Sequence, residues 1–219
     1  MLELHWLIWE DLLDVEETRV IAVSGTPGTG KTRFARLLAR KLGINYVSLT
    51  WFAMQHDLMK CYDHKRRTYV IDELGLTREL RRYLATLKGQ VLVEGHYSGR
   101  LVPKRFTEIV FVLRCDPDIL KTRLKRRGYS DEKVRENVEA EVLDICLSEA
   151  IATQGSEKVT EIDTSAKPVQ NCVEEALQIL GGKNLKQIGR YDWLTELERK
   201  GRLDKFLTEQ TVAWRRRSS

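Results

Sequence analysis

The sequence predicts an α/β fold in which helices cover both faces of a parallel β-sheet. Short, continuous apolar runs such as Val20–Ser24 are typical of strands that are buried on both faces. Amphipathic segments with apolar residues at helical spacing, such as residues 31–42, alternate with these runs. Strands that alternate with helices favour a parallel sheet, and 219 residues suffice for one full core with appendages.

Each element has its own signal in the sequence. Continuous apolar stretches predict strands at residues 20–24, 44–49, 91–93, 109–113 and 159–162. Helical spacing predicts helices at residues 31–42, 77–87, 130–153 and 169–180, and glycines follow three of them. Asp116 is expected to cap a further, basic helix, because the proline after it is tolerated in a first turn.

The chain divides into a core domain and two extensions. Residues 19–182 are predicted to form the core domain, and residues 183–219 a basic extension with short helices at 193–200 and 203–214. Residues 1–18 are apolar but lack the basic start of a signal peptide, and acidic residues interrupt them well short of membrane-spanning length. One expectation is that they form an amphipathic helix that packs on the domain. The alternative is that the start codon has been set too early and these residues are not part of the protein. We expect a soluble, cytoplasmic protein with no membrane partner.

The net charge of +5 lies in the C-terminal extension. The last 39 residues hold ten Lys and Arg against five Asp and Glu, so the first 180 residues sum to zero. This basic extension favours an anionic partner such as RNA. The alternatives are a solvated helix and a segment that docks on the domain through Trp193, Leu197, Leu203 and Phe206. Four separated cysteines without metal-site spacing indicate a reduced, intracellular protein without structural zinc.

The strongest motif is Gly-Thr-Pro-Gly-Thr-Gly-Lys-Thr at residues 25–32, which matches G-x-x-x-x-G-K-[ST] in full. It follows a predicted strand and opens a predicted helix, as a phosphate-binding loop must. Its glycines let backbone N–H groups surround phosphates, and the helix dipole adds partial positive charge. Lys31 is expected to bridge the β- and γ-phosphates of ATP, and the Thr32 hydroxyl to bind Mg²⁺. The motif predicts a P-loop NTPase fold. The alternative is a glycine-rich turn that is followed by Lys and Thr by chance.

The residues that accompany the motif narrow the class of P-loop protein. A GTPase would need a guanine-reading N-K-x-D, which the sequence lacks, and a large AAA-type module would need more residues. Arg123, Arg126 and Arg127 lie on the basic helix, and Arg123 and Arg127 share one face because they are four residues apart. Such a pair can close on a phosphoryl group in transfer; the alternative is a solvated basic face.

Together these segments resemble the adenylate kinase isoenzyme 6 family, small ATP-dependent nucleotide kinases and ATPases of archaea and eukaryotes tied to maturation of the small ribosomal subunit. The resemblance covers roughly residues 20–180. Besides the P-loop, it rests on Leu113-Arg114 before Asp116, Arg127-Gly-Tyr129 and Glu136-Asn-Val-Glu139-Ala-Glu141. It implies a nucleoside-monophosphate-kinase-like sheet with a short lid at about residues 126–136 and a monophosphate-binding region at about residues 48–70. It also implies a partner among the small-subunit ribosomal proteins.

The resemblance further implies the residues of the site. It implies ATP contacts at Gly28, Thr29, Gly30, Lys31, Thr32, Arg33 and Arg127. It implies catalytic roles for Lys31, Glu94, His96, Arg123 and Arg127. Thr32 and Glu94 would hold Mg²⁺.

Two departures from the family pattern bear on chemistry. Where the family usually has Asp-x-His after the strand at 91–93, this sequence has Glu94-Gly-His96. A carboxylate here normally reaches Mg²⁺ through a water, and glutamate reaches about 1.5 Å further than aspartate. His96 would order the attacking water or sense the γ-phosphate, unless it is merely half-exposed.

The second departure concerns the acceptor. The family's phosphate-gripping arginine falls on Met54 and a nearby aspartate on Trp51, two residues that could belong to the core. Arg66, Arg67 or Arg78 would then have to grip the acceptor phosphate, since charged contacts dominate phosphate binding.

The sequence thus predicts an enzyme that uses Mg²⁺ and ATP to phosphorylate AMP or another nucleoside monophosphate, with ATP hydrolysis alongside. One alternative is an assembly factor whose ATP cycle controls release of a ribosomal protein or rRNA. Another is a small P-loop kinase with a different acceptor. Because the gripping arginine is missing, ATP hydrolysis is better supported than AMP phosphorylation.

Overall fold

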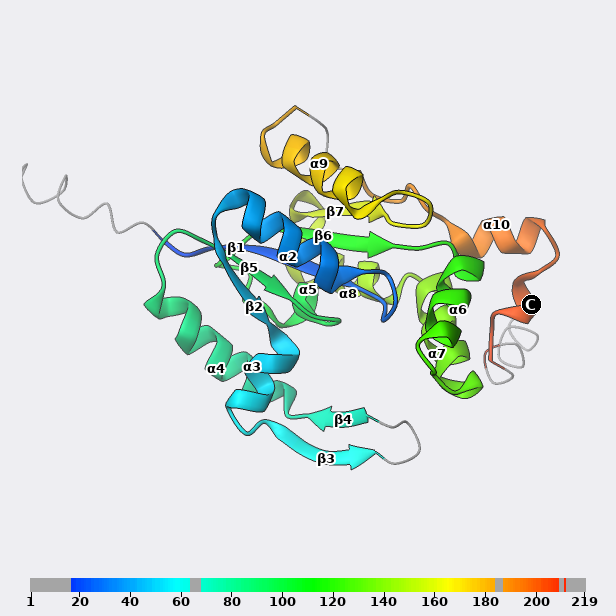
Figure 1. Cartoon of the computed structure of the whole chain (residues 1–219), viewed down its shortest axis with the longest axis horizontal. Coiled ribbons are helices and arrows are strands. Elements are labelled where there is room, and N and C mark those ends of the chain that lie inside the picture. The colour runs from blue at the N-terminus through cyan, green and yellow to red at the C-terminus, as the bar shows by residue number, and fades with distance from the viewer. Residues whose placement is uncertain (1–16, 64–67, 184–186, 209–210, 212–219) are drawn as a thin grey trace, which may run out of the picture.

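The computed structural model describes residues 17–63, 68–183, 187–208 and 211, and a five-stranded parallel sheet lies at its centre (Figure 1). The strand order is β2-β5-β1-β6-β7. The strands are β1 (Arg19–Gly25), β2 (Asn45–Ser48), β5 (Gln90–Glu94), β6 (Thr107–Arg114) and β7 (Val159–Asp163). The predicted fold class is confirmed, and all five predicted strands are present with ends that differ by two residues at most.

Two neighbouring strands bring the phosphate-binding motif and the acidic strand end together. β1 lies beside β5, and Val23 is the partner of Glu94 in this pairing. Because parallel strands end at the same edge of a sheet, the P-loop after β1 and the acid at the end of β5 share that edge.

Helices cover both faces of the sheet (Figure 1). On one face lie α2 (Lys31–Leu42) and α9 (Val169–Leu180). On the other lie α4 (Glu73–Thr86), α5 (Ser98–Leu101) and α8 (Ile145–Gln154). Successive residues of a strand point to opposite faces, so each apolar strand contributes to both layers of the core.

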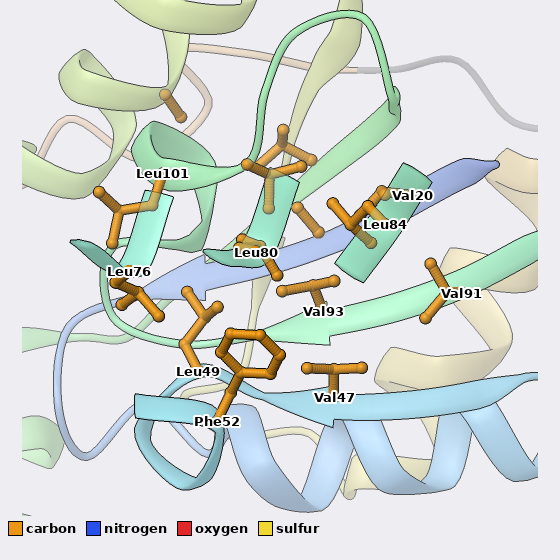
Figure 2. Packing of buried hydrophobic residues seen from close by; sticks show 14 of the residues in the cluster. Val20, Val47, Leu49, Phe52, Leu76, Leu80, Leu84, Val91, Val93 and Leu101 are labelled. Carbon is orange, nitrogen blue, oxygen red and sulfur yellow. The ribbon is translucent and has the colours of Figure 1, made fainter. Parts of the chain in front are cut away.

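Helix α4 packs closely on the sheet. Figure 2 shows Leu76, Leu80 and Leu84 of this helix packed over Val91 and Val93 of β5. Each of the three leucines is at most 1% exposed, and burial of one such side chain is worth about 1.5–3 kcal/mol. Tertiary packing therefore fixes α4 on the sheet.

Helix α4 begins earlier than predicted. It starts at Glu73, whereas the sequence indicated Thr77. Gly75 lowers the helical propensity of that first turn, but a Cβ there would lie 2.7 Å from Asp72 Oδ2 and 2.9 Å from Leu58 Cδ2. Close packing therefore requires the glycine that weakened the signal.

The region between β2 and α4 contains a hairpin that the sequence did not predict. After α3 (Leu49–Gln55), β3 (Met59–Asp63) and β4 (Thr68–Ile71) pair antiparallel. Tyr62 is the partner of Tyr69, and both rings are exposed. An exposed two-stranded ribbon needs no continuous apolar run, which was the signal used for the other strands.

The predicted long helix at 130–153 is wrong. The structure has two helices, α7 (Asp131–Val142) and α8, separated by Asp144 with φ of 55°. Helical spacing continues across the break, but the left-handed backbone of Asp144 ends the first helix. The Asp144 carboxylate pairs with buried Arg114, a contact that no local pattern announces.

Helices α6 (Pro117–Arg126) and α7 extend beyond the carboxyl end of β6. Asp116 caps α6 as predicted, since its Oδ1 accepts hydrogen bonds from Asp118 N at 2.9 Å and Ile119 N at 3.1 Å. Ser130 caps α7 through Lys133 N at 3.3 Å. The segment predicted as the lid is the junction between these two helices.

The C-terminal extension docks on α6 and α7. It forms α10 (Trp193–Arg199) and the short 3-10 helix η2 (Leu203–Lys205), where a helix to Trp214 was predicted. Leu197, Leu203 and Phe206 are buried against the two helices, and Trp193 is partly buried there. The docking alternative is confirmed for this part.

Residues 209–210 and 212–219 lie outside the described residues, as do residues 1–16. Within residues 17–208, apart from the gaps, no helix is long and apolar enough to cross a membrane.

Asp144 provides a test of stability against pH. Burial raises its pKa to about 6 from 3.8, with Glu141 and Glu161 adding to the rise and Arg114 opposing it. The folded state therefore holds this proton at pH values where the unfolded state has lost it, and the free energy of unfolding falls as pH rises through this window. Asp144→Asn keeps a residue that tolerates positive φ but removes the titration. We expect its Tm relative to the unmodified protein to increase by about 3 °C or more between pH 4 and pH 7, measured by calorimetry. A constant difference across this range would contradict the assignment.

Candidate functional site

The P-loop has the strand–loop–helix setting that the motif predicted. β1 ends at Gly25 and α2 begins at Lys31. Gly28 has φ of +98°, and a Cβ on it would lie 2.7 Å from Leu120 Cδ1. Any other residue would strain the backbone and collide with α6, so the glycine lets α6 approach the loop closely.

The loop is closed by bonds to one carbonyl. Thr26 O accepts hydrogen bonds from Thr29 N at 3.2 Å, from Thr29 Oγ1 at 2.9 Å and from Lys31 Nζ at 3.1 Å. Lys31 is 9% exposed, and this burial lowers the pKa of its amine. The ammonium thus lies inside the loop beside the Thr26 carbonyl, where it can attract a phosphate.

Glu94 is held by two hydroxyls at the end of β5. It is 6% exposed, and its Oε2 accepts a hydrogen bond from Tyr46 Oη at 3.0 Å. Its Oε1 lies 3.4 Å from Thr32 Oγ1. Burial, and then the Glu94 charge, raises the pKa of Tyr46, so Tyr46 remains a donor at neutral pH. The two predicted metal-side oxygens are therefore adjacent.

The chemistry of these donors fits Mg²⁺. Thr32 and Glu94 offer only oxygen atoms, which is the ligand type that Mg²⁺ prefers. Across the described ranges, no three His, Cys, Asp or Glu side chains gather as a metal site. Mg²⁺ is usually bound by one or two protein ligands together with phosphates and waters.

His96 is neutral and bonded through one nitrogen. Its Nδ1 lies 3.0 Å from Gly25 O, a group that can only accept, so Nδ1 carries the proton. Burial lowers the pKa of His96 to about 4, assisted by the charges of Lys31 and Arg100. At neutral pH the ring therefore offers Nε2 as an acceptor.

The two arginines predicted to act as a pair have different surroundings. Arg123 donates to Thr164 O at 2.6 Å and to Ser165 O at 3.0 Å, so its guanidinium binds the loop after β7. Arg127 is exposed and lines the cleft that contains Lys31. Sharing one helix face did not bring both guanidinium groups to this cleft, because the carbonyl groups of Thr164 and Ser165 bind that of Arg123.

One cleft of about 760 Å³ contains most of the predicted site. We call it the main cleft. It is lined by Gly28, Gly30, Lys31, Thr32, Arg33, Glu94, His96 and Arg127, among others. A second hollow of about 330 Å³, the side pocket, is lined by Thr29, Arg123, Arg126 and Lys167 and shares Gly28, Gly30, Arg33 and Arg127 with the main cleft. The predicted ATP contacts thus all lie on one of two hollows that share lining residues.

The end of the main cleft at the β3–β4 hairpin, where the acceptor is expected, differs from what the sequence suggested. Trp51 and Met54 were considered as core residues, but they are 60% and 57% exposed. Neither is among the residues that line the cleft. Arg78 is exposed and pairs with Glu79 at 3.2 Å, and Arg66 and Arg67 lie outside the described residues. Asp63, Tyr69 and Glu73 line this end instead.

Sequence reasoning missed some residues near the site. Tyr46 had no motif to mark it, since its partner Glu94 is 48 residues away. Cys146 Sγ lies 3.5 Å from His96 Nδ1, and Ser24 Oγ donates to His96 O at 2.8 Å. Lys133 and Asn137 also line the main cleft. Lys133 falls in the predicted lid and Asn137 in the Glu136–Glu141 motif, so both segments pointed to this helix without giving either residue a role.

Comparison with curated proteins finds archaeal relatives over most of the chain. A protein of Methanocaldococcus jannaschii, described as "Putative adenylate kinase", is 36% identical over 176 residues, which cover 79% of this chain and 92% of that protein. A protein of Thermococcus gammatolerans with the same description is 41% identical over 175 residues, which cover 80% of this chain and 92% of that protein.

Solved structures with the same fold include P-loop kinases. Shikimate kinase from Acinetobacter baumannii, solved with shikimate, matches with a TM-score of 0.56 at 18% identity, covering 78% of this chain and 97% of that chain. Shikimate kinase from Bacteroides thetaiotaomicron matches with a TM-score of 0.51 at 19% identity, covering 74% of this chain and 98% of that chain. At this identity the likeness concerns the fold alone.

A family model also matches the sequence directly. The model AAA_18, described as an AAA domain, matches residues 21–144. That segment runs from β1 to the break after α7 and holds the P-loop, Glu94, His96 and Arg127. The match is to this compact unit, although length had disfavoured a large AAA-type module. By the model and the relatives together, the chain belongs to the AAA_18 P-loop family and, within it, to the group whose archaeal members are described as "Putative adenylate kinase".

Proposed function

We propose that this protein catalyses Mg²⁺- and ATP-dependent phosphoryl transfer to a nucleoside monophosphate, with AMP as the first candidate, and hydrolyses ATP alongside. The observation that carries the proposal is the main cleft, which joins Lys31 and Thr32 of the P-loop to Asp63 and Tyr69 of the β3–β4 hairpin. Donor and acceptor would meet between them. The description of the archaeal relatives supports AMP as acceptor.

In this proposal the P-loop and the side pocket bind ATP. Backbone N–H groups of the loop and the Lys31 ammonium would hold the phosphates. The adenine would occupy the side pocket, which is continuous with the loop through Gly28 and Gly30. Arg123 would then shape the base pocket through Thr164 and Ser165, and Arg127 would supply the charge at the transferring phosphoryl group.

Thr32 and Glu94 would hold Mg²⁺, which neutralises phosphate charge when it is bound. Tyr46 would fix the Glu94 carboxylate through its 3.0 Å hydrogen bond. Neutral His96 would accept a hydrogen bond at Nε2 from the attacking group, an AMP phosphate in its protonated form or a water. The proton held on Nδ1 by Gly25 O makes this acceptor role available.

A second function, an ATPase switch with little kinase activity, is favoured by the acceptor end of the cleft. Neither Trp51 nor Met54 supplies a phosphate contact, and the carboxylates of Asp63 and Glu73 lie where an anionic acceptor would enter. In this version the protein acts in the cytoplasm in assembly of the small ribosomal subunit. Its partners would be a small-subunit ribosomal protein and rRNA, the latter bound by the basic C-terminal extension.

An acceptor panel tests both functions. Purified protein with Mg²⁺ and ATP is assayed with AMP, CMP, GMP, dAMP or no acceptor, and ADP and free phosphate are measured separately. We expect AMP to raise ADP formation above phosphate release by about tenfold or more, since a positioned acceptor outcompetes water. Equal ADP and phosphate in every arm would instead establish the ATPase switch. Absence of both products, with Mg²⁺ omitted as the control, would refute the proposed enzyme.

A further inference from the structure

The last glutamate of the Glu136–Glu141 motif does not reach the cleft. Glu136 and Asn137 line the main cleft, whereas Glu139 accepts hydrogen bonds from Thr208 N and Oγ1, each at 2.9 Å. Glu141 is 2% exposed and lies on α7 behind the P-loop. The proposed mechanism gives it no role.

Both oxygens of Glu141 are used. Its Oε2 accepts a hydrogen bond of 2.6 Å from Thr26 Oγ1, inside the P-loop. Its Oε1 accepts from Arg114 Nε at 2.9 Å and from Cys115 N at 3.0 Å. One carboxylate therefore joins the phosphate-binding loop to the end of β6.

Thr26 connects Glu141 to Lys31, because its hydroxyl bonds to the glutamate and its carbonyl to the lysine. It is fully buried, and its carbonyl accepts the hydrogen bonds from Thr29 and Lys31 that close the loop. A glycine-rich loop loses much backbone entropy when it adopts a single conformation. A bond of a hydroxyl to a charged acceptor is of the stronger kind and can offset part of that loss.

We propose that Glu141 is a positioning residue for nucleotide binding, which holds the P-loop in its phosphate-binding conformation through the Thr26 hydroxyl. It also fastens the loop to α7, the helix that carries the lid segment. Glu141 touches no phosphate and acts only through Thr26. The inference rests on the proposed binding of ATP at the loop.

The same cluster contains a matched residue for comparison. Arg114 donates to Glu161 Oε1 at 2.5 Å as well as to Glu141, and both glutamates are almost fully buried. The other oxygen of Glu161 accepts from Arg190 N at 3.1 Å in the C-terminal extension, away from the loop. Loss of either charge perturbs the same guanidinium, but only Glu141 contacts Thr26.

The experiment uses the full-length chain in five variants: Thr26→Val, Thr26→Ser, Glu141→Gln, the double variant Thr26→Val with Glu141→Gln, and Glu161→Gln. The Tm, kcat and the KM for Mg²⁺·ATP are measured for each. Hydrogen exchange of the peptide that spans residues 25–32 is followed without nucleotide.

Thr26→Val and Glu141→Gln are each expected to raise KM about tenfold with kcat within about threefold, since they remove one charge-assisted bond that acts on binding. The double variant should be no worse than either single variant, because both changes break the same bond. Thr26→Ser keeps the hydroxyl and should restore most of the affinity. Loop exchange should be faster in Thr26→Val and Glu141→Gln, whereas Glu161→Gln should lower Tm but leave KM and loop exchange near those of the unmodified protein.

An equal rise of KM in Glu161→Gln and Glu141→Gln would overturn the inference, because the effect would then come from the Arg114 cluster. Multiplying effects in the double variant, or no recovery in Thr26→Ser, would overturn it as well. If the unmodified protein does not bind Mg²⁺·ATP, the proposed function fails. The exchange of the loop peptide then still decides whether Glu141 holds the loop.

Discussion

Arg127→Ala is expected to lower turnover at least about 100-fold, with a smaller loss of ATP affinity, less than about tenfold. Arg127 follows the last turn of α6 and lines both the main cleft and the side pocket. Its charge would act where negative charge develops on the phosphoryl group in transfer, whereas the P-loop amides and Lys31 would hold the phosphates of bound ATP. Loss of the guanidinium should therefore raise the barrier more than it weakens binding.

The measurement is steady-state kcat and KM for ATP at saturating acceptor. Arg135→Ala is the matched control, because Arg135 is an exposed arginine of α7 that does not line the main cleft. If the turnover of Arg127→Ala lies within about threefold of that of Arg135→Ala, Arg127 has no role in the chemical step.

Glu94→Gln is expected to lower Mg²⁺-dependent turnover about 100-fold or more, since an amide cannot supply the negative charge that a metal site needs. The more informative change is Glu94→Asp, which installs the residue of the family pattern that the sequence resembles. Glu94 reaches between Tyr46 and Thr32, at 3.0 and 3.4 Å. A side chain about 1.5 Å shorter would lose the Tyr46 contact. We expect a fall of about tenfold or more, and a similar fall for Tyr46→Phe.

These rates are measured over a Mg²⁺ titration, so that weaker metal binding can be separated from slower chemistry. Glu108→Asp is the control. Glu108 is a carboxylate of the same sheet that binds Gln90 at the opposite end of β5. Faster turnover of Glu94→Asp would show that glutamate slows the natural enzyme. It would contradict the expectation that the metal site is adapted to glutamate.

Most of the fold could be predicted because it depends on local patterns. A strand that is buried on both faces has a continuous apolar run, and residues 20–23 of β1, 91–93 of β5 and 109–113 of β6 are such runs. The P-loop is likewise local, since its glycines, Lys31 and Thr32 act from fixed positions between one strand and one helix. The break at Asp144 could not be predicted, because apolar spacing continues through it and the reason for it is a contact with Arg114.

The parts of the site that the sequence left open depend on partners far along the chain. Tyr46 lies 48 residues from Glu94, and Thr26 lies 115 residues from Glu141. Helix periodicity put Arg123 and Arg127 on one face, but it could not decide that the carbonyls of Thr164 and Ser165 would bind the first of them.

The amino-acid sequence was sufficient to predict a parallel α/β sheet, a P-loop at residues 25–32 and an acid with a histidine at the end of another strand of that sheet. These follow from the periodicity of buried strands and helices and from a motif whose chemistry is confined to eight consecutive residues. The contacts between distant side chains came from the folded structure: Glu94 accepts a hydrogen bond from Tyr46, Trp51 and Met54 lie outside the cleft, and Glu141 accepts one from Thr26 of the P-loop. The physical reason is that a side chain bonds to whichever buried donor or acceptor the packed elements bring within reach, and burial makes an unpaired group too costly to leave.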